Sequence, residues 1–287
     1  MRFAFLGPRG THSEEALRAL APVGVEPVPH ATVRDAIMAV RGGAADRAVV
    51  PIENSLEGSV AATLDTLAID APEVRIVAER TLAIRQSLIA GRQLELDAIE
   101  RVLSHPQALA QCARFLRERL PGAEPAAAAS TAEGVRQVAA GDAPWAAIGS
   151  RLAAEEYGAT VLLESVEDRS DNATRFVALG RAGEAVLEVP TEAGAAKTSV
   201  VFFGFNDASP GALVAVLGEL SRREINLTKI ESRPRRLGLG HYMFFADLEG
   251  GEWEPHVAEA LAALAGRVET LHVLGSYPSA AGDELPH

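Results

Sequence analysis

The segment TLAIRQSLI, residues 81–89, alternates between two faces with a period of two. This spacing predicts an extended segment with one buried face. It interrupts a region in which short β-type runs alternate with amphipathic helices. We interpret it as the point where the chain passes from one α/β lobe into another, and the strand expected at residues 161–166 is the natural return path. Two such crossings make two lobes joined by a hinge, with a cleft between them.

The rest of the first 180 residues predicts an α/β domain built on largely parallel sheets. Strands are expected at residues 2–6, 47–52, 75–79, 99–103, 146–149 and 174–179. Helices are expected to begin at the N-cap residues Thr11, Thr32, Ser104 and Ser130, with Pro106 close to the first position of the third helix. We place this domain at residues 1–181, with the second lobe at about residues 80–160.

A second domain is expected at residues 197–277, after a linker at residues 182–196 that is rich in Ala, Gly and Glu. Its predicted order of strands and helices, βαββαβ, is the ferredoxin-like arrangement. Ser209 at the N-cap and Pro210 at the first helical position begin its first helix, which is expected to end at Arg223. The tail at residues 278–287 is polar and is predicted to be frayed.

Composition narrows the class of protein. The chain has 287 residues, is 48% hydrophobic and has one cysteine, Cys112, so a disulfide framework is excluded. No apolar run is long enough to cross a bilayer, and we expect a soluble, cytoplasmic protein. The net charge of -12 argues against nucleic acid or an anionic membrane as a partner. No zinc-ligand spacing occurs, so no metal is expected, and an anionic substrate would need local positive charge.

Three polar loops join a predicted strand to a helix start: residues 7–11, 50–59 and 104–111. The first exposes N–H groups suited to a carboxylate or phosphate, or is only a tight loop before a capped helix. In the second, Asn54 suits hydrogen bonding to a substrate, and Glu53 suits a structural role. In the third, Ser104 is equally well explained as a helix cap, His105 has no evident partner for a nucleophilic triad, and Cys112 is expected to be buried.

A fourth polar loop, residues 171–176, enters a predicted strand. Thr174 and Arg175 therefore leave the backbone on opposite faces, and Phe176 shares the side of Thr174. Arg175 suits a bidentate pair with a carboxylate, or is a salt-bridged surface residue. Alone, this segment is more simply explained as structural.

Taken together, these segments closely resemble the prephenate dehydratase family. The motifs are GPRGTHSEEAL, VPIENSLEGS, SHPQALAQC, STAEG and NATRF, in this order over about 180 residues. In the second domain, GALVAVLGEL and ESRP resemble the effector-binding elements of an ACT domain. The resemblance implies a two-lobed fold similar to type 2 periplasmic binding proteins. It also implies a lyase that converts prephenate to phenylpyruvate, carbon dioxide and water in the cleft, with no cofactor.

The resemblance also implies roles for single residues. Thr174 would donate a proton to the leaving hydroxyl, Asn54, Ser104 and Gln111 would hold or polarise the substrate, and Arg175 would meet a carboxylate. Other residues expected to contact the substrate are Thr11, Ser13, Glu53, Asn172 and Phe176. His12 departs from the pattern, because family members commonly carry an aromatic residue there. Either His12 makes the site sensitive to pH, or it only fills the part of the site's wall that the aromatic residue fills in family members.

For the ACT domain, the resemblance implies a dimer or tetramer that binds an aromatic amino acid, usually L-phenylalanine, between subunits. Gly211 and Ala212 leave room for this effector, and the polar groups at the end of a strand suit its ammonium and carboxylate. The expected effector residues are Gly211, Ala212, Leu213, Asn226, Glu231, Ser232, Arg233 and Pro234. Regulation would follow from different affinities of the effector for open and closed lobes.

Two other functions remain open. A non-catalytic amino-acid sensor would combine a binding-protein-like domain with an ACT domain, and the intact Thr174-Arg175-Phe176 disfavours it. An arogenate or cyclohexadienyl dehydratase would act on a substrate that has an amino group in place of the side-chain ketone. The motifs do not separate that activity from action on prephenate, whereas kinetics on both substrates would.

Overall fold

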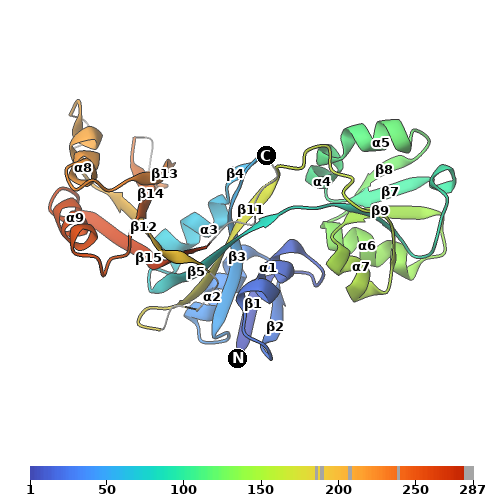
Figure 1. The fold of residues 1–287 in the computed structure, drawn as a ribbon, viewed down its shortest axis with the longest axis horizontal. Helices are drawn as coiled ribbons and strands as arrows, with labels where there is room; N and C mark the ends of the chain where they lie inside the picture. Colours follow the sequence, from blue (N-terminus) through green and yellow to red (C-terminus); the bar gives the residue numbers. More distant parts are fainter. Residues whose placement is uncertain (185–186, 188–190, 206–208, 238–239, 281–287) are drawn as a thin grey trace.

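The computed structural model describes residues 1–184, 187, 191–205, 209–237 and 240–280. Three sheets, each with its own helices, lie in a row in Figure 1. The lobe that contains the N-terminus lies in the middle. The second lobe lies on one side of it, and the C-terminal domain lies on the other.

The first lobe is a mixed sheet in the order β2-β1-β3-β11-β5, with β4 paired to β3. Its elements are β1 (Arg2–Leu6), α1 (His12–Leu20), β2 (Glu26–His30), α2 (Val33–Arg41), β3 (Arg47–Asn54), β4 (Gly58–Ser59), α3 (Ala61–Asp65), a π-helical turn (Thr66–Asp70), β5 (Val74–Ala83) and β11 (Ala173–Arg181). Side chains alternate along β1, so that Phe3 and Phe5 pack under α1 and Ala4 packs under α2. The two helices therefore cover opposite faces of this sheet.

The second lobe has the strand order β10-β6-β9-β7-β8. Its elements are β6 (Ser87–Ala90), a 3-10 turn (Leu96–Ala98), β7 (Arg101–Ser104), α4 (Pro106–Gln111), α5 (Ala113–Arg119), β8 (Glu124–Ala127), α6 (Thr131–Ala140), β9 (Trp145–Gly149), α7 (Arg151–Tyr157) and β10 (Thr160–Leu163). The chain enters it from β5 and leaves it from β10 to β11, as Figure 1 shows. The predicted pair of crossings and the two-lobed α/β fold are confirmed.

The expectation of largely parallel sheets is wrong. The pairs β1–β2, β1–β3, β7–β8 and β7–β9 are parallel, whereas β11 pairs antiparallel with β3 and β5, and β6 pairs antiparallel with β9 and β10. The reason is the double crossing. The strand that leaves a lobe and the strand that returns to it run in opposite directions, and each joins the sheet of its own lobe.

Most predicted helix starts are confirmed. Thr11, Thr32 and Ser130 are N-caps whose hydroxyls accept from the backbone N–H three residues later. Ser104 is not a cap, because it ends β7 and His105 is the N-cap of α4. Strands β2 and β8 were not predicted, because both contain proline, which is typical of edge strands, and both lie at a sheet edge.

The C-terminal domain has the predicted βαββαβ order. Its elements are β12 (Thr191–Phe203), α8 (Ala212–Ser221), β13 (Leu227–Pro234), β14 (Tyr242–Glu249), α9 (Pro255–Ala265) and β15 (Thr270–Ala280), with strand order β13-β14-β12-β15. Helix α8 begins at Ala212 after Gly211 rather than at Pro210 after Ser209, because Gly211 has a φ of 80°. Strand β12 begins within the range expected to be linker, and residues 281–287 of the expected tail lie outside the described residues.

The two faces of the C-terminal sheet have different neighbours. Helices α8 and α9 cover one face, around Val200 and Phe202. The other face packs on the first lobe, where Val201 and Phe245 share one apolar cluster with Ile76. Gly275 lies so close to Ile76 that a Cβ there would clash with the carbonyl oxygen of Ile76. The C-terminal domain and the first lobe thus share a continuous core.

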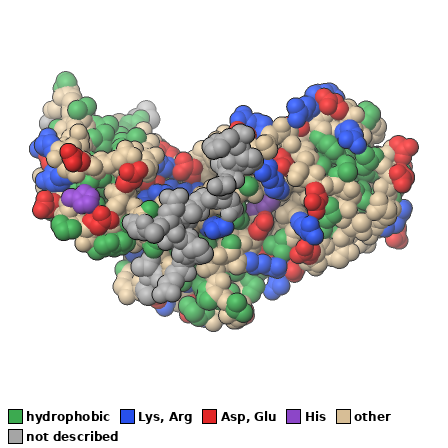
Figure 2. All heavy atoms as spheres, viewed as in Figure 1, with side chains coloured by type: hydrophobic (Ala, Val, Ile, Leu, Met, Phe, Trp, Pro, Cys, Tyr) green, Lys and Arg blue, Asp and Glu red, His purple; other side chains and the backbone are tan. Residues whose placement is uncertain are grey.

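Charged side chains of both signs are interspersed on the coloured part of the face in Figure 2. No helix within the described part of the chain is long and apolar enough to cross a membrane. The described residues also contain no group of three or more His, Cys, Asp or Glu side chains placed to hold a metal ion.

Candidate active site

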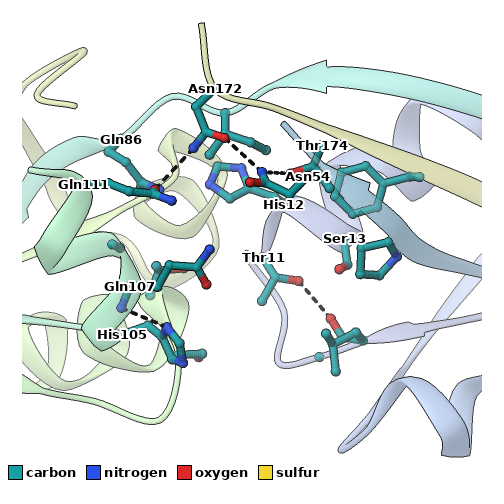
Figure 3. Close-up of a pocket in the computed structure, with 18 of the residues that line it drawn as sticks. Thr11, His12, Ser13, Asn54, Gln86, His105, Gln107, Gln111, Asn172 and Thr174 are labelled. Atoms are coloured by element: carbon teal, nitrogen blue, oxygen red, sulfur yellow. Dashed lines mark hydrogen bonds between the residues drawn. The ribbon is translucent and has the colours of Figure 1, made fainter. Parts of the chain in front are cut away.

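A cleft of about 380 Å³ opens between the two lobes. It is lined by the β1–α1 loop, the end of β3 and the start of β11 from the first lobe, and by the starts of α4 and α6 from the second. Seven of the residues expected to act on the substrate line it: Thr11, Ser13, Asn54, Gln111, Asn172, Thr174 and Phe176. Figure 3 labels all of these except Phe176 and shows how the labelled side chains converge.

Thr174 and Asn54 form the central contact of the cleft. Asn54 lies at the end of β3 and pairs in register with Thr174 on β11. Its Nδ2 donates to Thr174 Oγ1 across 2.8 Å. Asn54 Oδ1 accepts from the backbone N–H groups of Leu56 and Glu57, each at 3.0 Å, which fixes the orientation of the amide. Thr174 Oγ1 is therefore an acceptor towards Asn54, and its own proton is free to be donated into the cleft.

A chain of side-chain amides continues across the cleft. Asn54 Nδ2 also donates to Asn172 Oδ1 at 2.8 Å, and Asn172 Nδ2 donates to Gln111 Oε1 at 3.3 Å. Gln111 belongs to the second lobe and Asn54 to the first. Because these amides orient one another, a ligand in the cleft meets dipoles that are already fixed in place.

The cleft also contains residues to which the sequence assigned no substrate role. They are Gln86, Gln107, Ser130 and Thr131, together with His12 and His105. Gln86 lies in the crossing between the lobes, is 2% exposed and has no hydrogen-bond partner at Oε1 among the described residues. The sequence feature that could have identified Gln86 was its position in the alternating segment that crosses between the lobes. Ser130 was identified only as a helix cap, although a cap at a cleft also presents backbone N–H groups to a ligand.

Ser104 does not reach the cleft. It is fully buried, and its Oγ donates to the carbonyl oxygen of Ile148 at 2.6 Å, which ties β7 to β9. The expected role of Ser104 in holding substrate is therefore not supported by its position. Its buried hydroxyl has a structural function, because burial without that acceptor would leave it unsatisfied.

Arg175 lies on the opposite side of β11 from the cleft. Its Nε donates to Glu79 Oε2 at 2.7 Å, its Nη1 to Asp247 Oδ2 at 2.5 Å and its Nη2 to the Tyr277 hydroxyl at 2.7 Å. Ser199 Oγ donates to Asp247 Oδ1 at 2.6 Å. We call Glu79, Arg175, Ser199, Asp247 and Tyr277 the Arg175 cluster. Its partners come from the C-terminal domain and β5, so Arg175 is not placed to meet a substrate carboxylate.

The charges of the Arg175 cluster stabilise one another. Burial alone would lower the pKa of Arg175, but the acidic neighbours outweigh burial and raise this pKa above its ordinary value. Burial would raise the pKa of Asp247. The charge of Arg175 and the hydrogen bond from Ser199 outweigh burial, so the pKa of Asp247 is lowered. Burial raises the pKa of Tyr277 and keeps this phenol neutral.

Glu53 also faces away from the cleft. Its Oε2 lies 3.2 Å from Lys229 Nζ on β13 and 3.6 Å from Arg175 Nη1. The expectation that Glu53 contacts substrate does not fit this position. The alternative of a structural role agrees with these ion pairs to the C-terminal domain.

With Arg175 and Glu53 elsewhere, the described lining of the cleft contains no Lys, Arg, Asp or Glu side chain. Its titratable groups are His12 and His105. The local positive charge that an acidic protein needs for an anionic substrate is therefore not supplied by a permanent cation in the described lining.

The two lobes touch beside the cleft. Ser150 at the start of α7 donates through Oγ to the carbonyl oxygen of Gly10 at 2.7 Å, and the Tyr157 hydroxyl donates to the carbonyl oxygen of Arg9 at 2.9 Å. Gly10 has a φ of 78°, and a Cβ on it would meet Ala153 Cα at 2.7 Å. The GPRGT loop thus packs directly on the second lobe.

The expected effector residues fall into two groups. Gly211, Ala212 and Leu213 line a pocket with Phe205 and Phe244 in the C-terminal domain. Four of the others, Glu231, Ser232, Arg233 and Pro234, lie on β13, and Asn226 donates to Glu249 Oε1 at 2.9 Å. The single chain does not bring the two groups into one pocket.

Arg233 instead makes a bidentate ion pair with the first lobe. Its Nε and Nη2 lie 2.7 Å and 3.0 Å from the two carboxylate oxygens of Asp65, at the end of α3. Arg236 adds a contact to Asp65 at 2.7 Å, and Arg233 Nη1 donates to Glu231 at 3.3 Å. The ESRP segment therefore contacts the first lobe within one chain.

Comparison with known proteins agrees with this architecture. The family model for prephenate dehydratase matches residues 3–184, and the model for the ACT domain matches residues 199–266. A prephenate dehydratase from Mycobacterium sp. (strain JLS) is 45% identical over 296 residues, which cover 99% of this chain and 91% of the relative.

Two solved structures are similar over almost the whole chain. One is prephenate dehydratase from Arthrobacter aurescens in complex with L-Phe, with a TM-score of 0.86 and 40% identity, covering 100% of this chain and 92% of the other. A second, described as the quorum quenching acylase GqqA, has a TM-score of 0.85 and 31% identity and covers 98% of both chains. On the family match and the relative from Mycobacterium, this chain belongs to the prephenate dehydratase family.

Proposed function

We propose that this chain converts prephenate to phenylpyruvate, carbon dioxide and water, as a step of L-phenylalanine biosynthesis. The observation that carries the proposal is the contact between Asn54 and Thr174 in the cleft. It presents a hydroxyl whose acceptor side is occupied and whose proton is free. The neighbouring amides of Asn172 and Gln111 add fixed polar groups around the same space.

The reaction suits a site of this kind. The bond from the ring to its carboxylate breaks and releases carbon dioxide. The electron pair of that bond enters the ring, which becomes aromatic as the bond to the 4-hydroxyl breaks. The departing oxygen takes up one proton and leaves as water. Rearomatisation drives the reaction, so the protein has to orient the substrate and supply a proton to the departing oxygen.

Thr174 is proposed as the donor to that oxygen. An ordinary hydroxyl is a weak acid, so its effect depends on stabilising charge as the charge develops on the leaving oxygen. The hydrogen bond from Asn54 withdraws electron density from Thr174 Oγ1 and fixes its direction. Asn172 and Gln111 are proposed to hold substrate oxygens, and Phe176 on the same face of β11 to form an apolar wall for the ring.

The test is turnover of prephenate, followed by the ultraviolet absorbance of phenylpyruvate in alkali. We expect activity in the unchanged chain, a loss of about a hundredfold or more in kcat for Thr174→Ala, and partial retention for Thr174→Ser, which keeps the hydroxyl. Turnover by Thr174→Ala within a few-fold of the parent chain would contradict the role of Thr174. Lack of any phenylpyruvate from the unchanged chain would contradict the proposed function.

The same assay separates the nearest alternative substrate. Arogenate carries an amino group where prephenate carries a ketone, so it brings a positive charge into the cleft. The described lining has no carboxylate to pair with that ammonium group. We therefore expect kcat/KM for prephenate to exceed that for arogenate, measured in parallel.

The likeness to a structure described as a quorum quenching acylase gives a second candidate. An acylase needs an activated nucleophile, usually a hydroxyl beside a base that a third group orients. Among the described residues of the cleft, Thr174 is hydrogen-bonded to an amide rather than to a base. The geometry therefore supports the dehydratase better, and incubation with an N-acyl homoserine lactone tests for acylase activity directly.

We propose L-phenylalanine as the regulator and residues 197–277 as its domain, with residues 1–181 as the catalytic domain. The pocket at Gly211 and Ala212 is open, because small residues leave space beside Phe205 and Phe244. Val214 is 72% exposed at its rim, which suits coverage by a second copy of the chain in a dimer or tetramer. Arg233 of β13 is proposed to reach the effector carboxylate from the other subunit, in exchange for its contacts with Asp65 and Glu231 in its own chain.

Thermal stabilisation by each aromatic amino acid tests this regulatory site. We expect L-phenylalanine to raise the Tm of the unchanged chain and to have little effect on Ala212→Leu, which fills the pocket. Arg233→Ala is expected to abolish the shift as well. An unchanged shift in Ala212→Leu would place the effector elsewhere, and light scattering with and without L-phenylalanine measures the oligomeric state.

A further inference from the structure

The cleft has to accept a substrate with two carboxylates, although its described lining contains no Lys or Arg. Neutral N–H donors at the starts of α1 and α6 supply partial charge only. Full positive charge can come only from a histidine among these lining residues. His12 and His105 both project into the cleft (Figure 3), and their hydrogen bonds differ.

His12 has one ring nitrogen beside a carboxylate and one without a partner among the described residues. Its Nδ1 lies 3.1 Å from Glu15 Oε2, one turn further along α1, and its side chain is 16% exposed. A carboxylate accepts only, so Nδ1 carries the proton. Nε2 is buried and has no hydrogen-bond partner among the described residues. The ring lines the cleft, and no described protein group is hydrogen-bonded to this nitrogen.

His105 has the opposite arrangement. It caps α4, and its Nδ1 accepts from the backbone N–H of Gln107 at 3.3 Å. Nδ1 is therefore unprotonated, and the proton of the neutral ring lies on Nε2. Adding a second proton at Nδ1 would break this cap. The helix cap thus occupies Nδ1 of His105.

The charged groups around His12 are few. Glu15 is its partner on the same helix, and Glu14 is engaged elsewhere, because it accepts from the Gly10 N–H and pairs with Arg18. From the facing elements of the cleft, His105 is the only other titratable side chain in the described lining. No described carboxylate therefore competes with a substrate for Nε2 of His12.

We propose that protonated His12 binds a carboxylate of the substrate through Nε2. The proposal rests on the proposed function and deepens it, because it names the group that supplies positive charge to an otherwise uncharged cleft. Glu15 orients the ring and stabilises its charge, as a carboxylate behind a histidine commonly does. A hydrogen bond between two charged groups is among the stronger polar contacts in proteins.

The test is the pH dependence of KM and kcat for prephenate between pH 6 and 9, where histidine changes its charge. Prephenate keeps both carboxylates ionised over this range. In the unchanged chain we expect KM to rise with pH as His12 loses its proton. In His12→Phe, which keeps a planar ring, we expect a KM about tenfold higher at pH 6 and little dependence on pH, with kcat within a few-fold of the parent chain.

Three further variants sharpen the result. His12→Gln keeps a polar side chain without a titrating group and replaces His12→Phe if that variant does not fold. Glu15→Gln removes the carboxylate that orients the ring through Nδ1, and we expect a higher KM at pH 6 than in the parent chain. His256→Gln changes a half-exposed histidine of the C-terminal domain and is expected to keep the pH profile of the parent chain.

Retention of the parent's pH dependence of KM in both His12 variants would overturn the proposal. A loss confined to kcat would also overturn it, because that places His12 in the chemical step rather than in binding. Calorimetric binding of prephenate at pH 6 separates this failure from that of the proposed function. His12-dependent binding without turnover contradicts the dehydratase activity and supports the role of His12.

Discussion

Thr174 and Arg175 are consecutive residues of β11 whose side chains belong to two different sites. The hydroxyl of Thr174 accepts from Asn54 at 2.8 Å in the cleft between the lobes. The guanidinium of Arg175 contacts Asp247 at 2.5 Å and Tyr277 at 2.7 Å in the C-terminal domain. One strand therefore connects the proposed catalytic hydroxyl to the domain that is proposed to bind the effector.

Arg175→Ala is expected to destabilise the fold strongly. The side chain of Arg175 is 11% exposed, and its removal leaves the buried carboxylate of Asp247 without its ion-pair partner, whereas Glu79 keeps Lys197 at 2.8 Å. Breaking a buried ion pair on one side costs about 3–5 kcal/mol. Arg175→Lys keeps the charge but not the three-way fork of hydrogen bonds, so its loss is expected to be smaller. Urea unfolding measures both.

Arg169→Ala is the matched control. Arg169 pairs with Asp171 in the loop before β11, and its side chain is 64% exposed. We expect little change in the free energy of unfolding, as for most exposed ion pairs. Equal losses in Arg175→Ala and Arg169→Ala would show that the Arg175 cluster does not hold the domains together.

The Arg175 cluster also predicts how the free energy of unfolding depends on pH. The pKa of Asp247 is lowered in the folded chain, because Arg175 and the Ser199 hydroxyl outweigh burial. A lowered folded pKa means that this stabilisation is fully present above the unfolded value of about 3.9 and is lost as the pH falls through the folded pKa. We expect Asp247→Asn to be less stable than the parent near pH 7, with the difference shrinking below about pH 4. A constant difference between pH 3 and 7 would contradict this.

Asn54→Asp is expected to lower kcat for prephenate by about a hundredfold or more. The variant has the same shape, but it loses the N–H donor to Thr174 Oγ1 and brings a negative charge into a cleft that is proposed to receive an anion. Glu57→Gln controls for the loop, because the backbone N–H of Glu57, not its side chain, contacts Asn54. Normal turnover by Asn54→Asp would contradict the proposed role of Asn54.

The sequence predicted helices and strands better than it predicted contacts between distant residues. Strand β1 at Arg2–Leu6 and the caps Thr11, Thr32 and Ser130 follow from local patterns, and the structure has them. The prediction that Thr174 lies in the cleft came from considering several motifs together. The partners of Arg175 were beyond local patterns, because Asp247 and Tyr277 lie 72 and 102 residues away. A pattern shows that Arg175 faces away from Thr174, but not what covers that face.

Cys112 is expected to resist thiol reagents in the folded protein. It is fully buried, and burial, with the nearby carboxylates of Asp168 and Glu167, raises the pKa of its thiol to about 12. At pH 8 almost no thiolate exists to react. We expect a disulfide reagent such as DTNB to label the native chain slowly and without loss of prephenate turnover, and to label it completely in guanidinium. Rapid native labelling would show that this part of the second lobe opens readily.

Gly10→Ala is expected to weaken closure of the cleft. The φ of Gly10 is 78°, and a Cβ on it would clash with Ala153, where α7 of the second lobe approaches the GPRGT loop. The contact from Ser150 Oγ to the Gly10 carbonyl oxygen would be lost with that approach. Because misplacement of groups around a substrate is costly, we expect kcat/KM for prephenate to fall about tenfold or more.

Gly24→Ala separates closure from backbone strain. Gly24 has a φ of 88°, close to that of Gly10, but a Cβ on it would meet nothing within 4 Å. Both substitutions place alanine in a left-handed conformation, at a cost of about 1–2 kcal/mol in stability. Only Gly10→Ala also pushes the lobes apart. We therefore expect a loss of kcat/KM in Gly10→Ala alone, and a larger loss of unfolding free energy there than in Gly24→Ala, because the clash with Ala153 adds to the backbone strain. An equal loss of kcat/KM in both would mean that strain, not contact between the lobes, limits the activity.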